Sequence, residues 1–418
     1  MFYTGERKEL PEFVSREREV PIDGESAGGG TCSMARMDSS GADVGLEGGM
    51  TAPLDRRKAH LASSGGTTQP SKGRRVRIQD VAKEAQVSVS AVSKVLRDAY
   101  GVSAEMQAKV TAAIEKLGYR PQAGARAMRG RSYTVGVMLV ALSHPFQPEI
   151  VEGVTDELEP TPYQEILVTG GLSAERQQRS IEALVDRQVD GLIIIAPQMD
   201  TAWLEQLGAS LPTVVVARHG GATSFDTVVD DDQGGARLMV DHLVSLGHRR
   251  ILHTSHPAGG LERPHVLAHT ARCDGYIRAM RRHGLEPDVI ETAYTEEGGY
   301  RAAVEALSRP TLPTAIFAGA DIAALGVLRA AEERGLRVPE ELTVTGYDNV
   351  NASSIGRVSL TTVDQSGHLT GQMSARILLE RLNGRTQPTH YVLAPRLVPR
   401  GTSAAAAVGL TTGVARSS

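Results

Sequence analysis

Apolar residues recur at helical spacing between residues 78 and 117. The first group stands one helical turn apart on a single stripe: Ile78, Val81, Ala82 and Ala85. This spacing predicts a short amphipathic helix over residues 78–85. A second helix is predicted over residues 89–96, with Ser88 as its N-cap, and a third begins after Ser103 and ends at Gly118. Two short helices joined by the tight link Gln86–Val87 are typical of a helix-turn-helix unit.

The second predicted helix has an apolar side and a side of small residues. Val92, Val95 and Leu96 are available for burial. The residues left on or near the free face are Val89, Ser90, Ala91, Ser93 and Lys94. Small side chains let a helix lie deep in a DNA major groove, where Lys94 can reach a guanine or a phosphate.

From residue 134 onward, continuous runs of Val, Ile and Leu alternate with helical patterns. The first series includes the runs TVGVMLVAL, YQEILVTG, GLIIIA and PTVVVA, and the second includes RILHT, DVIETAY, TAIFAG and LTVTGYD. Such runs are typical of parallel strands buried on both faces. The sequence therefore predicts two doubly wound α/β lobes after the helical headpiece.

Charge is distributed unevenly along the chain. Residues 74–131 hold 12 Lys and Arg against 5 Asp and Glu, a local charge of +7, whereas the whole chain carries −4. Basic residues therefore concentrate where DNA would bind, although short surface helices are often basic for other reasons. Cys32 and Cys273 suggest no disulfide, no run is long enough to span a membrane, and the first 30 residues lack a signal-peptide pattern. We expect a cytoplasmic protein close to the nucleoid, without a cofactor.

The two ends have a different composition from the rest. Residues 1–73 are rich in Gly, Ser, Thr and charge, and residues 402–418 in Ala, Gly, Thr and Ser, which predicts disorder in both. The first segment is interpreted as coding sequence upstream of the real start, at Met37 or Met50, or alternatively as a regulatory tail. Nucleotide-binding and hydrolase motifs such as G-x-x-x-x-G-K-[ST] and G-x-S-x-G are absent, which leaves an enzyme as the weaker hypothesis.

The residues between about 75 and 401 carry a family resemblance. The headpiece and hinge contain DVAKEAQVSVSAVSKVL, VSAEMQAKVTAAIEKLGYRP and ARAMRGRSYTVGVM, and the later part contains RQVDGLIIIAP, GARLMVDHLVSLGHRRI and LTVTGYDN. These runs resemble the lactose-repressor (LacI/GalR) family of bacterial transcription regulators. The resemblance implies an α/β two-lobed, periplasmic-binding-protein-like sensor with doubly wound parallel sheets, joined to an all-α helix-turn-helix headpiece. The expected domains are the headpiece (74–120), the hinge (121–132), one lobe (133–218 and 364–388) and a second lobe (219–363 and 389–401).

The predicted DNA contacts come from the headpiece and the hinge. They are Ile78, Ser88, Val89, Ser90, Ala91, Ser93, Lys94, Arg97, Arg126 and Met128. The resemblance implies that the hinge forms a helix on DNA and inserts Met128 into the minor groove. Gly124 stands where a larger residue is usual, and glycine costs a helix about 1 kcal/mol relative to alanine. We therefore expect Gly124→Ala to tighten DNA binding, unless residues 121–131 are only a flexible linker.

The predicted effector contacts lie at strand ends and in the loops after them, where α/β clefts bind ligands. They are Phe146, Arg218, Arg272, Ala320, Asp321, Tyr347, Asp348 and Gln365. The resemblance assigns ligand roles to Arg272 and Asp348. Phe146 is equally suited to the core, Asp321 to capping a helix, and Gln365 to either role.

Two positions depart from the family pattern and one cluster lies outside it. Ala320 stands where an asparagine is usual, and Thr270 where a second arginine is usual, so the polar lining is sparser than in a sugar sensor. His253, His256, His265, His269 and Cys273 form a cluster that could ligate zinc or copper, but the chance grouping of histidines in a loop is the simpler interpretation, and no metal is expected.

Together these features predict a ligand-responsive regulator, a repressor that binds a pseudo-palindromic operator as a homodimer or tetramer. A sugar is the leading effector class. The alternative is a sensor or carrier of the same two-lobed fold that does not recognise a DNA sequence.

Overall fold

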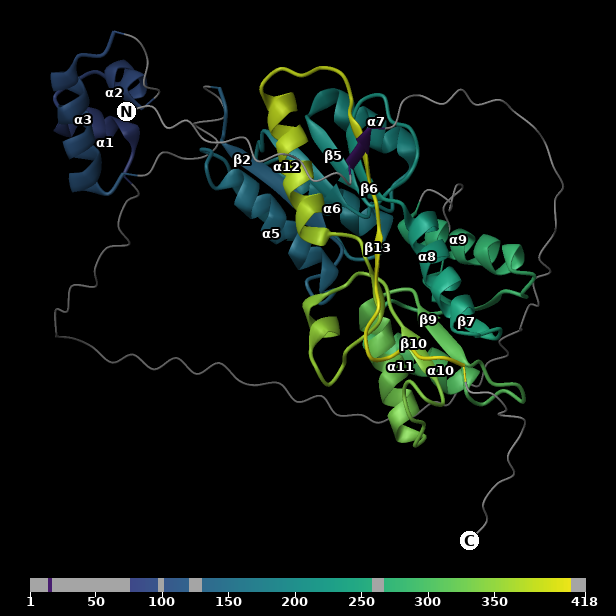
Figure 1. Ribbon diagram of the computed structural model, residues 1–418. Coiled ribbons are helices and arrows are strands. Elements are labelled where there is room, and N and C mark those ends of the chain that lie inside the picture. The colour runs from purple at the N-terminus through teal and green to yellow at the C-terminus, as the bar shows by residue number, and fades with distance from the viewer. Residues whose placement is uncertain (1–13, 17–75, 97–100, 120–129, 258–266, 407–418) are drawn as a thin grey trace, which may run out of the picture. The chain divides into compact units, whose positions relative to one another are not determined.

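The computed structural model describes residues 14–16, 76–96, 101–119, 130–257 and 267–406. Contacts divide the chain into two compact units (Figure 1): a headpiece within residues 19–121, and a sensor within residues 122–418 that also includes residues 14–16. Arg97, Arg126, Met128 and the hinge residues 121–129, including Gly124, lie outside the described residues.

The headpiece contains the three predicted helices, α1 (Ile78–Glu84), α2 (Val89–Val95) and α3 (Ala104–Leu117). Ser88 and Ser103 cap α2 and α3 by accepting hydrogen bonds from the backbone N–H groups of Ala91 and Met106, at 3.1 and 3.2 Å. Gly118 ends α3 in the left-handed conformation, with φ of 60°. The core joins all three helices through side chains that include Val81, Val92, Val110 and Ala113. The predicted helix ends are correct to within one residue.

The first lobe of the sensor is built on one large sheet. Its parallel strands are β2 (Thr134–Leu139), β3 (Gln164–Thr169), β4 (Gly191–Ile195), β5 (Thr213–Val216), β6 (Asp226–Asp230) and β12 (His390–Leu393), in the order β12-β6-β5-β4-β2-β3. β1 (Val14–Arg16) pairs antiparallel with the free edge of β12. Successive residues of β4 enter different cores, since Ile193 belongs to one and Ile194 to the other.

Helices cover both faces of this sheet. α5 (Phe146–Leu158) and α12 (Gly367–Leu382) pack side by side on one face (Figure 1), and α6 (Ala174–Val185) and α7 (Thr201–Ser210) contribute to the core on the other. A Cβ added at Gly153 of α5 would lie 1.9 Å from the His368 carbonyl oxygen of α12. Glycine therefore permits this close crossing.

The second lobe repeats the plan with a smaller parallel sheet. Its order is β10-β9-β7-β8, formed by β7 (Ile251–Ser255), β8 (Asp288–Glu291), β9 (Ala315–Ala318) and β10 (Thr343–Thr345). One core contains side chains of α10 (Glu296–Ala306) and α11 (Asp321–Glu333), and the other contains side chains of α8 (Asp232–Ser245) and α9 (Ala268–Arg282). The short η2 (Asn351–Ser354) precedes β11 (Thr362–Asp364), which pairs antiparallel with β13 (Arg396–Val398).

The chain passes between the lobes three times. The crossings are the links from β6 to α8 at Asp231, from β11 to α12 at residues 365–366, and from β12 to β13 at residues 394–395. Two crossings therefore leave the carboxyl ends of first-lobe strands, the edge at which α/β proteins bind ligands.

The structure corrects the predicted domain boundaries. β6 and β12 were assigned to the second lobe, but they hydrogen-bond to each other and β6 pairs with β5 in the first. The error arose because the chain crosses after these strands rather than before them. The segment from residue 402, predicted to be disordered, is folded through residue 406: Thr402 accepts a hydrogen bond from the Val344 N–H at 3.0 Å, and Ala406 donates to Leu246 at 2.8 Å. Within the predicted disordered segment 1–73, residues 14–16 form β1, and the others lie outside the described residues.

Candidate functional site

The exposed side of α2 has the predicted composition. Val92 is fully buried, and Val95 and Leu96 are partly buried against the headpiece core. The exposed residues are Ser88, Val89, Ser90 and Lys94, and Ala91 and Ser93 are half-buried. Ile78, the first residue of α1, packs partly against the core. One short helix therefore presents small side chains and one lysine to solvent, a surface suited to a DNA groove.

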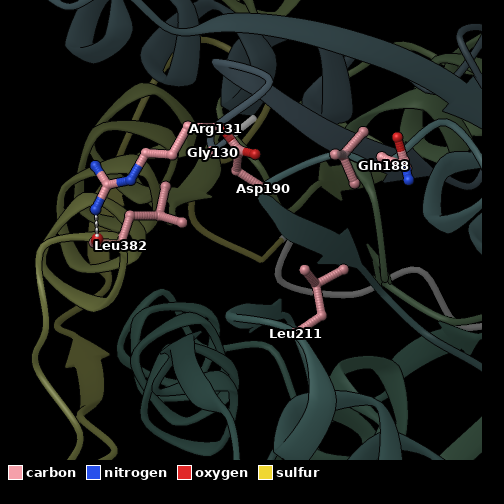
Figure 2. Close-up of a pocket in the computed structure, with 7 residues that line it drawn as sticks. Gly130, Arg131, Gln188, Asp190, Leu211 and Leu382 are labelled. Atoms are coloured by element: carbon pink, nitrogen blue, oxygen red, sulfur yellow. Dashed lines mark hydrogen bonds between the residues drawn. The ribbon is translucent and has the colours of Figure 1, made fainter. Parts of the chain in front are cut away.

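The chain joins the sensor beside a surface hollow of about 340 Å³ at the amino-terminal ends of the first-lobe strands (Figure 2). The Asp190 carboxylate fixes this junction because it accepts hydrogen bonds from the N–H groups of Ser132 and Tyr133, at 2.8 and 2.7 Å, and from the Ser132 hydroxyl at 3.0 Å. Arg131 donates to the carbonyl oxygen of Leu382, the last residue of α12, as Figure 2 shows. Asp190 and Arg131 therefore tie the segment before β2 to the loop before β4 and to the end of α12.

A buried polar network lies where the two lobes meet. Arg272 of α9 donates to one oxygen of Asp232, from Nη2 at 2.7 Å and from Nε at 3.2 Å, and also to the carbonyl oxygen of Gly319. Its guanidinium carbon lies 3.6 Å from the centre of the Tyr347 ring. The Tyr347 hydroxyl donates to Asp230 at 2.6 Å, and His219 pairs with the second oxygen of Asp232 at 2.8 Å. The network therefore ties the crossing segment after β6 to α9 and to the loop after β10.

Burial and charge separate the pKa values of the two aspartates in this network. Burial raises the pKa of Asp230, and the neighbouring charge of Asp232 raises it further. Burial acts on the pKa of Asp232 in the same direction, but the charges and hydrogen bonds of Arg272 and His219 together outweigh burial and lower that pKa below its usual value. Asp232 is consequently the ionised partner of Arg272, and Asp230 favours its protonated form.

Asp348 and Gln365, two of the predicted effector contacts, are hydrogen-bonded to each other. The Gln365 amide donates to Asp348 Oδ1 at 2.5 Å, and the backbone of Asp348 bridges to that of Asp364. Within the described residues, the buried Oδ2 of Asp348 has no hydrogen-bond partner. Burial raises the pKa of Asp348 well above its usual value. A buried acceptor without a partner at a strand end is a strong indication of a ligand site.

Asp321 was predicted either to bind the effector or to cap a helix. In the structure its carboxylate holds neighbouring loops by hydrogen bonds and does not cap its own helix, α11. Its carboxylate accepts hydrogen bonds from the Val350 N–H at 3.0 Å and from the hydroxyls of Ser353 and Thr362, at 2.5 and 2.6 Å. Asp321 thus holds the loop after β10 and the start of β11 against α11. Ala320, just before it, is fully buried.

Arg218 and Phe146 are engaged elsewhere. Arg218 donates within its own lobe, to the Pro197 carbonyl at 3.2 Å and to the Thr201 hydroxyl at 3.1 Å. Phe146 lies in the first-lobe core against Gly367. The structure therefore brings together Arg272, Tyr347, Asp348 and Gln365, whereas Arg218 is hydrogen-bonded within the first lobe and Phe146 lies in the first-lobe core.

Of the described members of the histidine cluster, His253 is fully buried, and His256 and His269 are half-buried. His253 is fully buried between the rings of Tyr276 and Phe317 and hydrogen-bonds to the Phe317 carbonyl at 2.9 Å. The rings of His256, His269 and Tyr294 lie next to one another, with centroids 5.1 to 6.4 Å apart. His265 and Cys32 lie outside the described residues, and within those residues no three His, Cys, Asp or Glu side chains are placed to hold a metal.

Sequence reasoning missed the part of Asp230 and Asp232. Both belong to the run VVDDDQGG, three carboxylates directly after a short apolar run. The apolar run belongs to β6, which the sequence analysis did not identify as a strand. The acids at its carboxyl end were therefore not considered as part of a ligand site. Recognition of the strand would have drawn attention to the acids after it.

In the described part of the chain, no helix has the length and apolar character needed to cross a bilayer.

Comparison with known proteins gives matches to both units. The profile of the lacI family of bacterial regulatory proteins matches residues 77–122, and that of the periplasmic binding protein-like domain matches residues 240–403. The chain is 33% identical to catabolite control protein A of Priestia megaterium, over 77% of this chain and 97% of the relative. It is also 33% identical to the ribose operon repressor of Escherichia coli K12, over 78% of this chain and 99% of the relative.

Solved structures are similar to this chain in fold. The lac repressor dimer bound to operator and the anti-inducer ONPF matches with a TM-score of 0.70 at 28% identity, covering 79% of this chain and all of the other. The complex of the transcriptional regulator CelR with cellobiose matches with a TM-score of 0.59 at 30% identity, with the same coverage.

Proposed function

The chain belongs to the lacI family of bacterial regulatory proteins, and on this premise we propose that it is a transcriptional repressor controlled by a small molecule. The observation that carries the proposal is the combination of an exposed α2 surface with a buried, incompletely hydrogen-bonded polar network between two sensor lobes. The first supplies DNA contacts and the second a place for an effector. The relatives named above are a control protein and a repressor, which favours a regulator over an enzyme.

We place the DNA contacts on α2, with Lys94 as its only basic residue. The repressor acts as a homodimer on a pseudo-palindromic operator in the cytoplasm, as the operator-bound dimer of the lac repressor suggests. Two-fold symmetric half-sites would each receive one α2. Selection of bound duplexes from a random DNA library, followed by mobility shifts, tests this directly. Enrichment of a pseudo-palindrome supports the repressor, whereas no preference among duplexes supports a sensor or carrier that does not recognise a DNA sequence.

The first lobe carries an apolar surface suited to the dimer contact. Leu142, Ile166, Leu167 and Leu172 lie on β3 or on the loops after β2 and β3, with 37 to 66% of each side chain exposed. β3 is also the last strand of its sheet. Pairing with a second copy would cover both the apolar side chains and the strand edge. Leu167→Asp should therefore give monomers in sedimentation experiments, whereas an unchanged dimer would place the interface elsewhere.

The effector is proposed to bind at the lobe junction, against Asp348, Gln365 and the Arg272 network. A ligand bound there contacts both lobes, so it can favour one lobe arrangement over another. The anchor at Asp190 and Arg131 then offers a route by which this arrangement affects the hinge. A sugar is the leading class because the cellobiose complex of CelR is similar in structure. Thermal-shift screening of the protein against sugars tests this effector class, because a bound ligand raises the melting temperature by mass action.

A further inference from the structure

The polar atoms left without partners at the lobe junction belong to carboxyl, imidazole and phenol groups. Within the described residues, the buried unpartnered atoms near Arg272 are Asp230 Oδ1, Asp348 Oδ2, His144 Nδ1, His269 Nε2 and the Tyr294 hydroxyl. Each of these side chains lies close enough to Arg272 for its charge to affect the pKa. They come from both lobes, since His144 follows β2 of the first and His269 lies on α9 of the second.

The imidazoles of this group are uncharged at neutral pH. Burial, together with the charges of Arg272 and His256, lowers the pKa values of both His144 and His269 to about 4. His269 is also hydrogen-bonded to the Pro257 carbonyl, which requires its protonated nitrogen and leaves the unpartnered Nε2 as an acceptor. The Nε2 atom of His269 therefore accepts hydrogen bonds, and neither ring supplies positive charge at neutral pH.

The buried cation of the network, Arg272, is already neutralised. Arg272 directs two donors at Asp232 and one at Gly319, and its face lies on Tyr347. The two remaining carboxyl groups, on Asp230 and Asp348, have no cationic hydrogen-bond partner among the described residues, because Asp230 is bonded to the Tyr347 hydroxyl and Asp348 to the Gln365 amide. In this part of the described chain, an anionic ligand would therefore meet acids rather than an unpaired cation.

Ala320 and Thr270 both leave this part of the molecule with fewer hydrogen-bond donors than the family pattern provides. Ala320 offers a methyl group where an amide is usual, and Thr270 uses its hydroxyl to donate to the Leu267 carbonyl at 2.7 Å. Both substitutions remove donors from this part of the molecule. The chemistry that remains calls for a ligand that brings donors and positive charge.

We propose that the effector carries a protonated amine together with several hydroxyl groups, as an amino sugar does, and that Asp348 and Asp230 receive the ammonium group. This deepens the function proposed above and rests on it. The ammonium group has three donors and no acceptor, which matches the unpartnered oxygens. The hydroxyl groups would donate to His144 and His269.

Binding of an ammonium group at Asp348 and Asp230 should change how these acids hold their protons. Asp348 faces Arg272, Asp321 and Glu149, and Asp230 faces Asp231, Asp232, Tyr347 and Arg272; in both cases burial, the largest effect, raises the pKa. Both acids therefore hold protons more tightly than usual in the free protein. A bound ammonium group favours their ionised forms, so binding of an amine releases protons and binding of a neutral sugar does not.

The test uses the full chain with matched ligand sets: glucosamine, glucose and glucose 6-phosphate, and the corresponding galactose and mannose sets. We expect at least one amine to bind about tenfold more tightly than its neutral counterpart, the ratio expected when a charge-assisted hydrogen bond replaces a neutral one. The phosphates should not bind. Calorimetry in two buffers of different ionisation enthalpy should show proton release for the amine only.

Two variants complete the design. Asp348→Asn should abolish the preference for the amine and the proton release, whereas Asp156→Asn, which changes an exposed carboxylate of α5, should leave both unchanged. Tighter binding of a phosphate or a neutral sugar than of its amine, or no response to any amine, would overturn the assignment. Operator binding without ligand is measured in parallel, so that a failure of this assignment is distinguishable from a failure of the proposed repressor function.

Discussion

The pair formed by Arg272 and Asp232 provides a direct test of the lobe junction. The Arg272 and Asp232 side chains are only 5% and 1% exposed, and the shorter of their two hydrogen bonds is 2.7 Å. Asp232→Ala leaves the guanidinium buried with only the Gly319 carbonyl and the Tyr347 ring beside it. Loss of one partner from a buried pair costs about 3–5 kcal/mol, because the other charge is left uncompensated.

The size of this effect separates it from an ordinary ion pair. For a lobe of this size, each kcal/mol lowers the melting temperature by roughly 2–4 °C, so Asp232→Ala should lower it by roughly 6–20 °C. Glu305→Ala is the control, because Glu305 pairs with Arg309 at a similar distance of 3.0 Å but is 60% exposed. Exposed pairs of this kind contribute about 0.2–1 kcal/mol, so the control should change the melting temperature little.

Two signals show which lobe is affected. Trp203 is the only tryptophan of the chain and lies on α7 of the first lobe, so its fluorescence reports that lobe. Far-UV circular dichroism reports both. Asp232→Ala should lower the melting temperature seen by circular dichroism more than that seen by Trp203. The double variant Asp232→Leu with Arg272→Met should recover part of the loss, because no charge is then left buried. Equal effects of Asp232→Ala and Glu305→Ala would refute this account.

Three other predictions follow from the headpiece, the lobe contact and the helix crossing. Lys94→Ala should weaken operator binding by about 1–3 kcal/mol and binding to random duplex less, measured by fluorescence anisotropy; equal losses would make Lys94 a phosphate contact. Burial raises the pKa of Glu149 from 4.5 to about 7, so the unfolded chain loses this proton first and stability should fall as pH rises between these values. Urea unfolding from pH 4.5 to 8 should show a smaller fall in Glu149→Gln, and an unchanged pH profile would exclude Glu149 as the cause. Gly153→Ala should destabilise the first lobe by about 1–3 kcal/mol because its Cβ would meet the backbone of α12; Gly356→Ala, with open space around it, is the control, and equal stability of the two variants would contradict the close crossing.

Local sequence determined most of the secondary structure. The ends of α2 and α3 follow from Ser88, Ser103 and Gly118, because caps act on backbone groups within one turn of the helix. The long apolar runs identified β4 and β9 because a strand buried on both faces needs apolar residues at every position. Arg272 and Asp348 were found through a family pattern, and the network around them confirms only that they lie together.

Tertiary structure decided what depends on pairing between distant residues. β6 is five residues long and begins and ends with aspartate, so its sequence alone did not predict a strand, and its lobe was fixed by hydrogen bonds to β5 and to β12, some 160 residues away. Arg218 follows the end of β5 and Arg272 lies on α9, yet sequence reasoning assigned both to the effector site. In the structure Arg218 donates within its own lobe, whereas Arg272 donates to Asp232, 40 residues away. A side chain's partner is set by where the backbone carries it, and local sequence patterns act over only a few residues. The pairing of Arg272 with Asp232 and the unpartnered oxygen of Asp348 therefore became visible only in the folded chain.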